Sequence, residues 1–227
     1  MSEADWADDG SAQAWGTDSE LLADDPIHRP VSDSETIFQG VVWNVVRERF
    51  ELEGTTIARE FISHTGAVAI LAIDERDRVL LIKQYRHPIR ARDWELPAGL
   101  LDVLGEAPVM AAQRELAEEA DLVADDWSLL CDFASSPGGS NEAIRVYLAR
   151  GVRAAPEAHE RTDEEAGIEV RWVPLDDVVN AILDRRVQNS ILIIAALTAH
   201  TARNRGWDSL GNADSPWPRH PLSRSEQ

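Results

Sequence analysis

The sequence predicts an α+β fold. Short apolar runs typical of strands and longer segments with helical spacing follow one another without regular alternation, which favours an α+β core over a wound parallel sheet. The chain has 227 residues, of which 44% are hydrophobic. That is enough apolar material for one sizeable core with appendages.

The two ends of the chain predict loose tails. Residues 1–35 contain ten acidic residues against the single Arg29, so we expect a disordered acidic tail that buries too little surface to order itself. An alternative is that Trp6 or Trp15 docks this tail onto the domain. Residues 206–227 contain three prolines among polar residues and predict a second loose tail.

The N-terminal half predicts strands. Residues 39–52 and 55–62 interleave β-branched and charged residues and turn at Gly54, which predicts a small antiparallel sheet over residues 36–62. Apolar runs at 67–73 and 79–84, joined by the polar turn 74–77, predict a hairpin with one buried face. Residues 94–96 are expected to continue that sheet.

The first helix is predicted over residues 107–120. Val109, Ala112, Leu116 and Ala120 recur at helical spacing, and Pro108 stands where the first turn of a helix tolerates proline. The remaining predicted strands are 127–133, 143–149 and 168–173, and the remaining predicted helices are 175–185 and 190–203, with Asn189 as the cap of the last.

Composition excludes some classes of function. Acidic residues outnumber basic ones 41 to 22, a net charge of −19, so neither nucleic acid nor an anionic membrane surface is expected as a partner. The single cysteine, Cys131, and a start without a basic, apolar signal indicate a reducing compartment, which we expect to be the cytoplasm. The longest apolar run, residues 191–197, is too short to span a bilayer.

Three carboxylates on the first helix are the candidate chemical site. Glu115, Glu118 and Glu119 are three and four residues apart, so their side chains project from one face. A solvated acidic face is the simpler interpretation. However, a loop with Gly99 leads toward the cluster and Arg114 is a possible counter-ion. Clustered carboxylates bind hard cations such as Mg²⁺, which serve hydrolysis at phosphorus.

Residues 99–122, GLLDVLGEAPVMAAQRELAEEADL, resemble the Nudix box, G-x5-E-x7-R-E-U-x-E-E-x-G-U with U aliphatic. Glu106, Arg114, Glu115, Leu116, Glu118, Glu119 and Leu122 match at the family's spacing. Two features differ: six residues instead of five separate Gly99 from Glu106, and Asp121 replaces a glycine. The longer loop resembles Nudix hydrolases that act on ADP-ribose. Aspartate tolerates the left-handed backbone expected at position 121, so we expect a small stability cost.

The resemblance covers residues 39–200 and implies the Nudix α/β/α sandwich with a small N-terminal antiparallel sheet. It implies a Nudix hydrolase domain at residues 63–205, preceded by a dimerising sheet at 36–62 in a homodimer. Without the resemblance, that sheet would be an extra hairpin.

The resemblance also implies a metal site for Mg²⁺, with Mn²⁺ as an alternative. Glu115, Glu119 and the Ala98 carbonyl would hold the ion, and Glu118 would be an additional or water-mediated ligand. Arg114 would orient the carboxylates through charge-assisted hydrogen bonds. Glu106 would tie the loop to the start of the helix, where the helix dipole favours a carboxylate.

The catalytic base of this subfamily lies on a late acidic loop, which corresponds to Glu164 or Glu165. Glu164 fits better once the following strand is aligned, although both would be exposed acidic residues if the loop had no catalytic role. The base would deprotonate a water molecule.

Further residues match positions that contact substrate. Arg86 would approach the pyrophosphate, or form a salt bridge at a strand end. Glu142 would accept hydrogen bonds from ribose hydroxyls, or serve as a turn residue. Arg59 and Glu60 match residues donated by a partner subunit, or form a surface ion pair, and His64 is either a substrate contact or structural.

The resemblance therefore implies a Mg²⁺-dependent pyrophosphatase that cleaves ADP-ribose to AMP and ribose 5-phosphate. Two alternatives remain open: an enzyme for another nucleoside diphosphate sugar or dinucleotide, and a non-catalytic Nudix-like nucleotide sensor. Fold-level analogy does not separate them.

Overall fold

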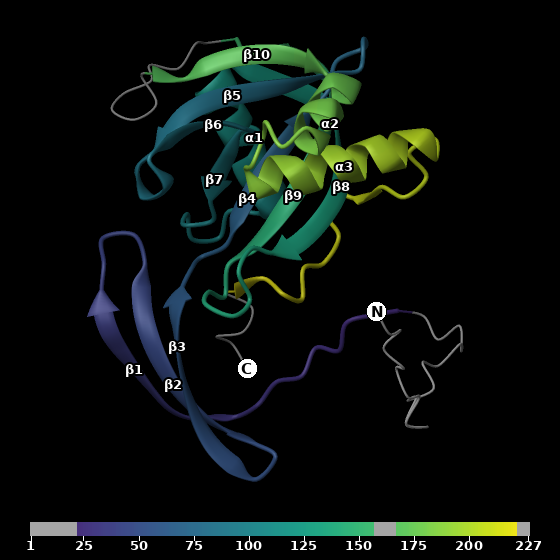
Figure 1. The fold of residues 1–227 in the computed structure, drawn as a ribbon. Coiled ribbons are helices and arrows are strands. Elements are labelled where there is room, and N and C mark those ends of the chain that lie inside the picture. Colours follow the sequence, from purple (N-terminus) through teal and green to yellow (C-terminus); the bar gives the residue numbers. More distant parts are fainter. Residues whose placement is uncertain (1–21, 157–166, 222–227) are drawn as a thin grey trace, which may run out of the picture.

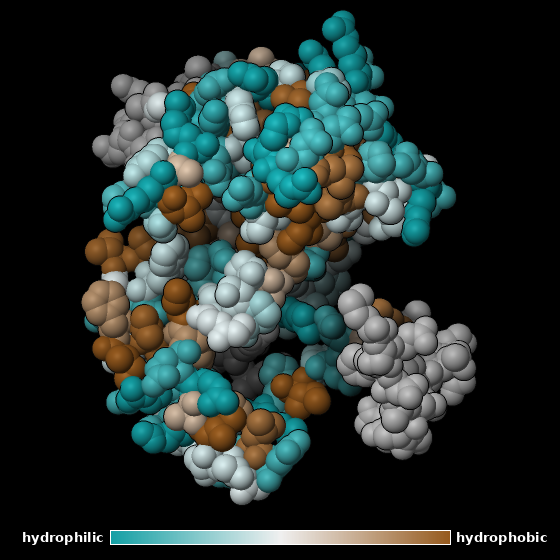
Figure 2. Space-filling view, viewed as in Figure 1, coloured by the Kyte–Doolittle hydropathy of each residue, from teal (hydrophilic) through white to brown (hydrophobic). Residues whose placement is uncertain are grey.

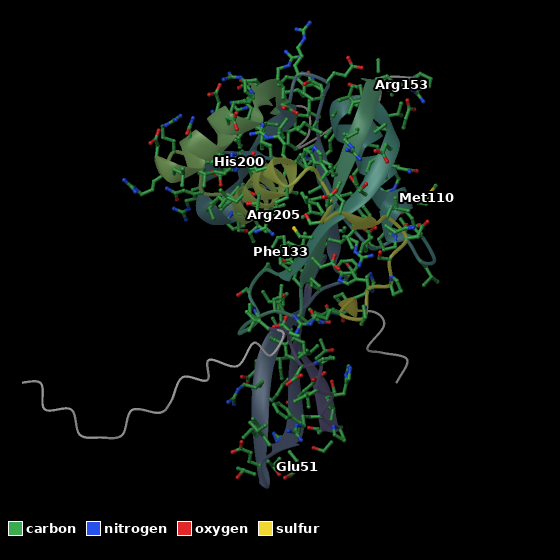
Figure 3. The ribbon with its side chains drawn as sticks, turned by 90° about the vertical axis from the view of Figure 1, so that its right-hand side faces the viewer. Glu51, Met110, Phe133, Arg153, His200 and Arg205 are labelled. Carbon is green, nitrogen blue, oxygen red and sulfur yellow. The ribbon has the colours of Figure 1, made fainter. Side chains whose placement is uncertain are left out.

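The computed structural model describes residues 22–156 and 167–221 (Figure 1). Three strands, β1 (Val31–Gln39), β2 (Asn44–Leu52) and β3 (Thr55–Ser63), form an antiparallel sheet in the order β1-β2-β3. This N-terminal sheet projects from the rest of the molecule, and its far tip, marked by Glu51, points away from it (Figure 3). The chain turns between β2 and β3 at Glu53 and Gly54, both with positive φ, as a tight hairpin requires.

The sheet has one strand more than the sequence predicted. Residues 31–35 were expected to be disordered, but they begin β1, which pairs with β2 from Val31 to Gln39. The acidic residues that suggested a tail have partners across the strands: Arg47 of β2 binds Glu35 at 2.9 Å. Residues 1–21, including Trp6 and Trp15, lie outside the described part of the chain.

A five-stranded mixed sheet, β11-β8-β9-β4-β7, forms the centre of the domain. Its strands are β4 (Ala67–Ala72), β7 (Ala98–Leu100), β8 (Leu122–Ala134), β9 (Ala143–Ala154) and β11 (Gly211–Asn212). All six residues of β4 are buried, because β4 lies between β9, which is parallel to it, and β7, which is antiparallel.

A second sheet, β10-β5-β6, contains β5 (Arg78–Arg86), β6 (Ala91–Glu95) and β10 (Glu169–Pro174). The predicted hairpin of residues 67–73 and 79–84 is therefore wrong. The chain does turn at residues 74–77, but the two strands share a single bridge, Ile73 to Val79. β4 pairs with β9 and β7 instead of β5. Its residues are buried on both faces, which is typical of a central strand.

Helices cover both faces of the central sheet, which confirms the predicted α/β/α sandwich. Residues alternate along β4: Val68, Ile70 and Ala72 pack toward α1 (Pro108–Ala120), whereas Ala67, Ala69 and Leu71 pack toward α2 (Leu175–Leu183) and α3 (Ser190–Asn204). Figure 3 shows Met110 of α1 and His200 of α3 on opposite sides of the strands. A short 3-10 helix, His87–Ile89, links β5 to β6.

The helix boundaries agree with the sequence to within two residues. The predicted cap is also confirmed, since Asn189 accepts a hydrogen bond from Leu192 N–H at 3.0 Å. In residues 22–156 and 167–221, no helix combines the length and the apolarity needed to cross a membrane.

The segment after α3 is docked onto the domain, so the prediction of a loose tail from residue 206 is wrong as far as residue 221. Arg145, 2% exposed, donates hydrogen bonds to the Ser215 and Pro216 carbonyls and stacks on Trp217 at 4.7 Å. The buried guanidinium thus holds a polar, proline-rich segment that has little intrinsic structure of its own.

Candidate active site

The turn from β7 into α1 brings a backbone strand against the acidic helix. Gly99 of β7 lies so close to Glu115 that a Cβ atom added to the glycine would stand 2.0 Å from the Glu115 Cδ and Oε1 atoms. One residue earlier, Ala98 N–H donates a hydrogen bond to Glu119 Oε2 at 2.9 Å. The Glu119 residue is 6% exposed, so two glutamates of α1 contact the Ala98–Gly99 backbone.

Helix α1 presents these glutamates because its other face is apolar. Ala111, Ala112, Leu116 and Ala120 are buried against the central sheet, which turns the glutamates toward β7 and the preceding loop. The helix ends at Asp121, whose φ of 54° and ψ of 38° are left-handed. The expectation of a left-handed aspartate at this position is confirmed.

Arg114 binds three of the carboxylates. Its guanidinium donates to Glu106 at 3.0 and 3.1 Å, to Glu115 at 2.6 Å and to Glu118 at 3.1 Å. The hydrogen bond from Arg114 lowers the pKa of Glu106, and the same pair raises the pKa of Arg114 above its usual value. Glu106 therefore connects the loop to α1, but through Arg114 in the second turn and not through the helix start as expected.

The donor set fits a hard divalent cation. One guanidinium pairs with three carboxylates, and the fourth, Glu119, accepts a hydrogen bond from the Ala98 backbone, so negative side-chain charge exceeds positive charge around Gly99. In the described residues, no three side chains of the metal-binding types converge on one point, because Arg114 binds Glu115 and Glu118 while Glu119 is directed to Ala98. A cation beside Glu115 and Glu119 would relieve this excess with the oxygen ligands that Mg²⁺ prefers.

Glu142 and His64 form a second group, on the loop between β8 and β9 and at the end of β3. His64 Nε2 lies 3.3 Å from Glu142 Oε1, and Ser135 Oγ donates to Glu142 Oε2. Glu142 lines a cavity of about 430 Å³, together with Phe133, Ser140 and residues 25–29 and 217–219. The glutamates of α1 are not among the residues that line this cavity.

Arg86 ends β5 and binds a buried carboxylate. Its guanidinium donates to Glu95 at 2.8 to 3.2 Å, and Gln84 Nε2 donates to the same Glu95 at 3.2 Å. Glu95 is 4% exposed, whereas the Arg86 side chain is 43% exposed. The salt bridge expected as the alternative role of Arg86 is present, and it holds a partly exposed guanidinium at the strand end.

Comparisons with known proteins agree with this geometry. The family model described as NUDIX domain matches residues 63–194. The chain belongs to the Nudix family. It is 41% identical to an ADP-ribose pyrophosphatase of Mycobacterium tuberculosis over 84% of this chain and 91% of that protein. It is 36% identical to an ADP-ribose pyrophosphatase of Bacillus subtilis over 69% of this chain and 84% of that protein.

Other matches bear on fold and on the breadth of the Nudix family. A methanol dehydrogenase activator of Bacillus methanolicus is 35% identical over 71% of this chain and 87% of that protein. A crystal structure of an ADP compounds hydrolase superposes with a TM-score of 0.66 over 81% of this chain and 99% of that one. At 18% identity, the superposition shows the Nudix fold alone.

The site described above does not include two pairs of predicted site residues, for different reasons. Glu164 and Glu165 fall in residues 157–166, outside the described part. Arg59 and Glu60 lie on the N-terminal sheet, where Arg59 donates to the Ala58 carbonyl and Glu60 binds Arg47 at 2.7 Å. Each of the two residues therefore has a different partner from the Arg59–Glu60 ion pair that was the alternative.

Sequence reasoning missed Glu95 and Trp43. Glu95 is two residues before Pro97 in a strand, and its burial with Gln84 and Arg86 follows from cross-strand register, which the sequence did not reveal. Trp43 stacks on His64 with ring centroids 5.6 Å apart. A tryptophan within the predicted strand 39–52 gave no sign of that contact.

Proposed function

We propose that this Nudix protein is a Mg²⁺-dependent pyrophosphatase that hydrolyses ADP-ribose to AMP and ribose 5-phosphate. The observation that supports it most is the close approach of the Ala98–Gly99 backbone to Glu115 and Glu119, inside a domain of the Nudix family. The names of the two pyrophosphatase relatives support ADP-ribose as the substrate.

Glu115, Glu119 and the Ala98 carbonyl hold Mg²⁺ in this proposal, with Glu118 as an additional ligand and Mn²⁺ as a substitute. The ion would neutralise charge on the diphosphate and favour ionisation of water. Arg114 orients Glu115 and Glu118 and is itself fixed by Glu106. The fork geometry of the guanidinium suits this role better than a lysine would.

Glu164 is the proposed catalytic base, with Glu165 as the alternative. A carboxylate on a loop accepts the proton of the attacking water. The experiment compares Glu164→Gln with Glu165→Gln, and the variant with the larger fall in kcat identifies the base. If both variants are as active as the wild type, neither glutamate is the base.

Arg86 and Glu142 are the proposed substrate contacts, Arg86 with the pyrophosphate and Glu142 with ribose hydroxyls. The exposed part of the Arg86 guanidinium suits phosphate oxygens, and its buried partner Glu95 fixes its direction. Glu142 lines a cavity and retains lone pairs that accept hydrogen bonds from vicinal hydroxyls.

A homodimer formed through the N-terminal sheet completes the proposal. All nine residues of β1 are exposed, and an apolar patch of Ile37, Phe38, Val41, Val42 and Trp43 lies at the β1–β2 turn (Figure 2). A sheet without a covering layer is rarely stable by itself, and a second copy would cover it. In the dimer, Arg59 and Glu60 would approach the partner's site.

Cytoplasmic localisation is proposed from the single cysteine.

A substrate panel tests the function. The full chain is incubated with Mg²⁺ and, separately, ADP-ribose, ADP-glucose, NADH or diadenosine polyphosphates, and AMP release is measured. Highest kcat/KM for ADP-ribose supports the proposal. Preference for another compound would favour a different Nudix pyrophosphatase, and no turnover of any compound would favour a nucleotide sensor.

A further inference from the structure

His64 is held between the N-terminal sheet and the loop that bears Glu142. Its side chain is 4% exposed, and Nδ1 accepts a hydrogen bond from Gly66 N–H at 3.0 Å. A neutral imidazole whose Nδ1 accepts must have its proton on Nε2. Nε2, which then carries the proton, lies 3.3 Å from Glu142 Oε1, so the polar N–H group lies next to the carboxylate.

Burial favours the neutral form of the ring. Desolvation lowers the pKa of His64, and the nearby charge of Glu142 opposes this shift to a smaller extent. The neutral tautomer has one acceptor, which takes the hydrogen bond from Gly66 N–H, and one donor, which lies next to Glu142. No ring nitrogen remains for a substrate hydroxyl, so the expected direct contact of His64 with substrate is not supported by this geometry.

The main chain around His64 is joined to the same loop. His64 N–H donates to Asn141 Oδ1 at 2.8 Å, Ile62 N–H donates to the Gly139 carbonyl at 2.9 Å, and Asn141 N–H donates to the Ile62 carbonyl at 3.3 Å. The loop is thus attached to the end of β3 at Ile62 and at His64. Its position relative to His64 is fixed by these contacts.

Trp43 covers the imidazole from the N-terminal sheet. The two ring centroids are 5.6 Å apart and the ring planes differ by 32°. Trp43 immediately precedes β2, and it is 47% exposed. The N-terminal sheet therefore supplies one wall of the His64 site, and the Glu142 loop supplies the other.

We propose that His64 is a positioning residue, which uses its Nε2–H to hold the Glu142 carboxylate in the orientation that binds substrate, with Trp43 keeping the imidazole in place. The inference rests on the proposed function, in which Glu142 binds the ribose of ADP-ribose. Ser135 Oγ holds the other oxygen of Glu142, so loss of His64 would free the carboxylate on one side. If Glu142 loses its orientation before the substrate binds, the substrate and the transition state are both bound more weakly, and by the same amount.

The decisive test measures His64→Phe, Glu142→Gln and the double variant with ADP-ribose and Mg²⁺. His64→Phe keeps a ring against Trp43 but removes both nitrogens. We expect KM to rise about tenfold and kcat to stay within about threefold in each single variant, because a hydrogen bond to a charged group is lost without a transition-state contact. The double variant should be no worse than the worse single variant, since both remove one interaction.

His64→Gln is the rescue variant, because its amide N–H₂ can donate to Glu142 as Nε2–H does. We expect its KM to lie closer to the wild type than that of His64→Phe. His200→Phe is the matched control: His200 lies on α3 and pairs with the exposed Asp176, and its KM and kcat should not change. Circular dichroism checks that each variant is folded.

An NMR measurement separates failure of this inference from failure of the proposed function. Nitrogen-15 histidine spectra of the full chain, with the His64 signal assigned by its loss in His64→Phe, report which nitrogen is protonated without any substrate. Nε2 protonation supports the inference; Nδ1 protonation overturns it. Unchanged KM in folded His64→Phe, or additive effects in the double variant, also overturns it, whereas absent ADP-ribose turnover in the wild type overturns the proposed function.

Discussion

The backbone of Gly99 lies against the Glu115 carboxylate, and the space between them is too small for a Cβ atom. A Cβ at position 99 would stand 2.0 Å from Glu115 Cδ and 2.5 Å from Cγ, far inside van der Waals contact. The glycine that opens the Nudix box is therefore needed for close approach of strand β7 to helix α1. Its backbone conformation is not left-handed, so steric space rather than φ explains the residue.

Gly99→Ala is expected to displace Glu115 and lower kcat/KM for ADP-ribose roughly hundredfold, because small misplacements of catalytic groups have effects of that size. Mn²⁺ affinity, measured by electron paramagnetic resonance, should fall as well. Gly138→Ala is the control, since its Cβ would meet nothing within 4 Å. Equal losses in both variants would contradict the steric explanation.

Glu119→Gln should reduce kcat by at least about a hundredfold while leaving the fold intact. The amide oxygen still accepts the hydrogen bond from Ala98 N–H, so the substitution removes a charge without removing the structural contact. Turnover with saturating Mg²⁺ and the midpoint of urea unfolding measure the two effects. Glu118→Gln, whose side chain is 38% exposed, should lose less activity. A Glu119→Gln variant with near-normal kcat would refute the assignment of Glu119 as a ligand.

The elements with local signals were predicted from sequence. Helix α1 and its left-handed end at Asp121 follow from apolar spacing, Pro108 and the Nudix box. Pairings over long sequence distances were not predicted: β4 pairs with β9, more than seventy residues later, although a hairpin with the next strand was expected. Strand β1 was missed because its polar residues resemble a tail, and only contacts such as Glu35–Arg47 show their role.

The same division holds for the site. Spacing within one helix predicted that Glu115, Glu118 and Glu119 lie on one face and that Arg114 pairs with carboxylates of that face, whereas the ion pair of Arg114 with Glu106 was not predicted. By contrast, Glu95 beneath Arg86 and Trp43 over His64 depend on contacts between separate elements. Those contacts leave no periodic signal in a single sequence.

Asp121→Gly is expected to stabilise the fold by about 0.5 to 1 kcal/mol, because glycine adopts the left-handed conformation without strain and a negative charge leaves the C-terminal end of α1. Urea unfolding measures the change, and kcat should stay constant. Asp121→Asn keeps a side chain suited to φ of 54°, so it should gain only the electrostatic part. If the glycine variant is less stable, the interactions of the Asp121 side chain stabilise the fold by more than its left-handed backbone costs.

Arg145→Met should destabilise the domain by about 2 kcal/mol or more, because Asp132 loses its partner and two carbonyls lose their donor. The Asp132 side chain is 32% exposed, so hydration limits the loss. Urea unfolding gives the stability, and limited proteolysis should show earlier cleavage after residue 205. Arg153→Met is the matched control, since Arg153 and Asp125 are both well exposed and should change stability by about 0.5 kcal/mol or less. Equal stability losses in the two variants would show that Arg145 has no special role in docking the C-terminal segment.

Cys131 gives a pH-dependent prediction. Burial raises the pKa of its thiol from 9.0 to about 11, although a hydrogen bond with Thr198 opposes the shift. At pH 8 the native thiol should therefore react with iodoacetamide about a hundredfold more slowly than the thiol of the urea-unfolded chain, because only the thiolate is nucleophilic. Mass spectrometry of timed samples measures both rates.

The same shift makes folding stability depend on pH. Between pH 9.0 and 11 the unfolded chain loses the thiol proton while the native chain keeps it, so the native state binds more protons and stability falls as pH rises, by on the order of 2 kcal/mol. Cys131→Ala removes this contribution while leaving the other titrating groups in place. The difference in unfolding free energy between wild type and Cys131→Ala should therefore shrink across that range. Parallel stability curves for the two proteins would show that the native thiol titrates as it does in the unfolded chain.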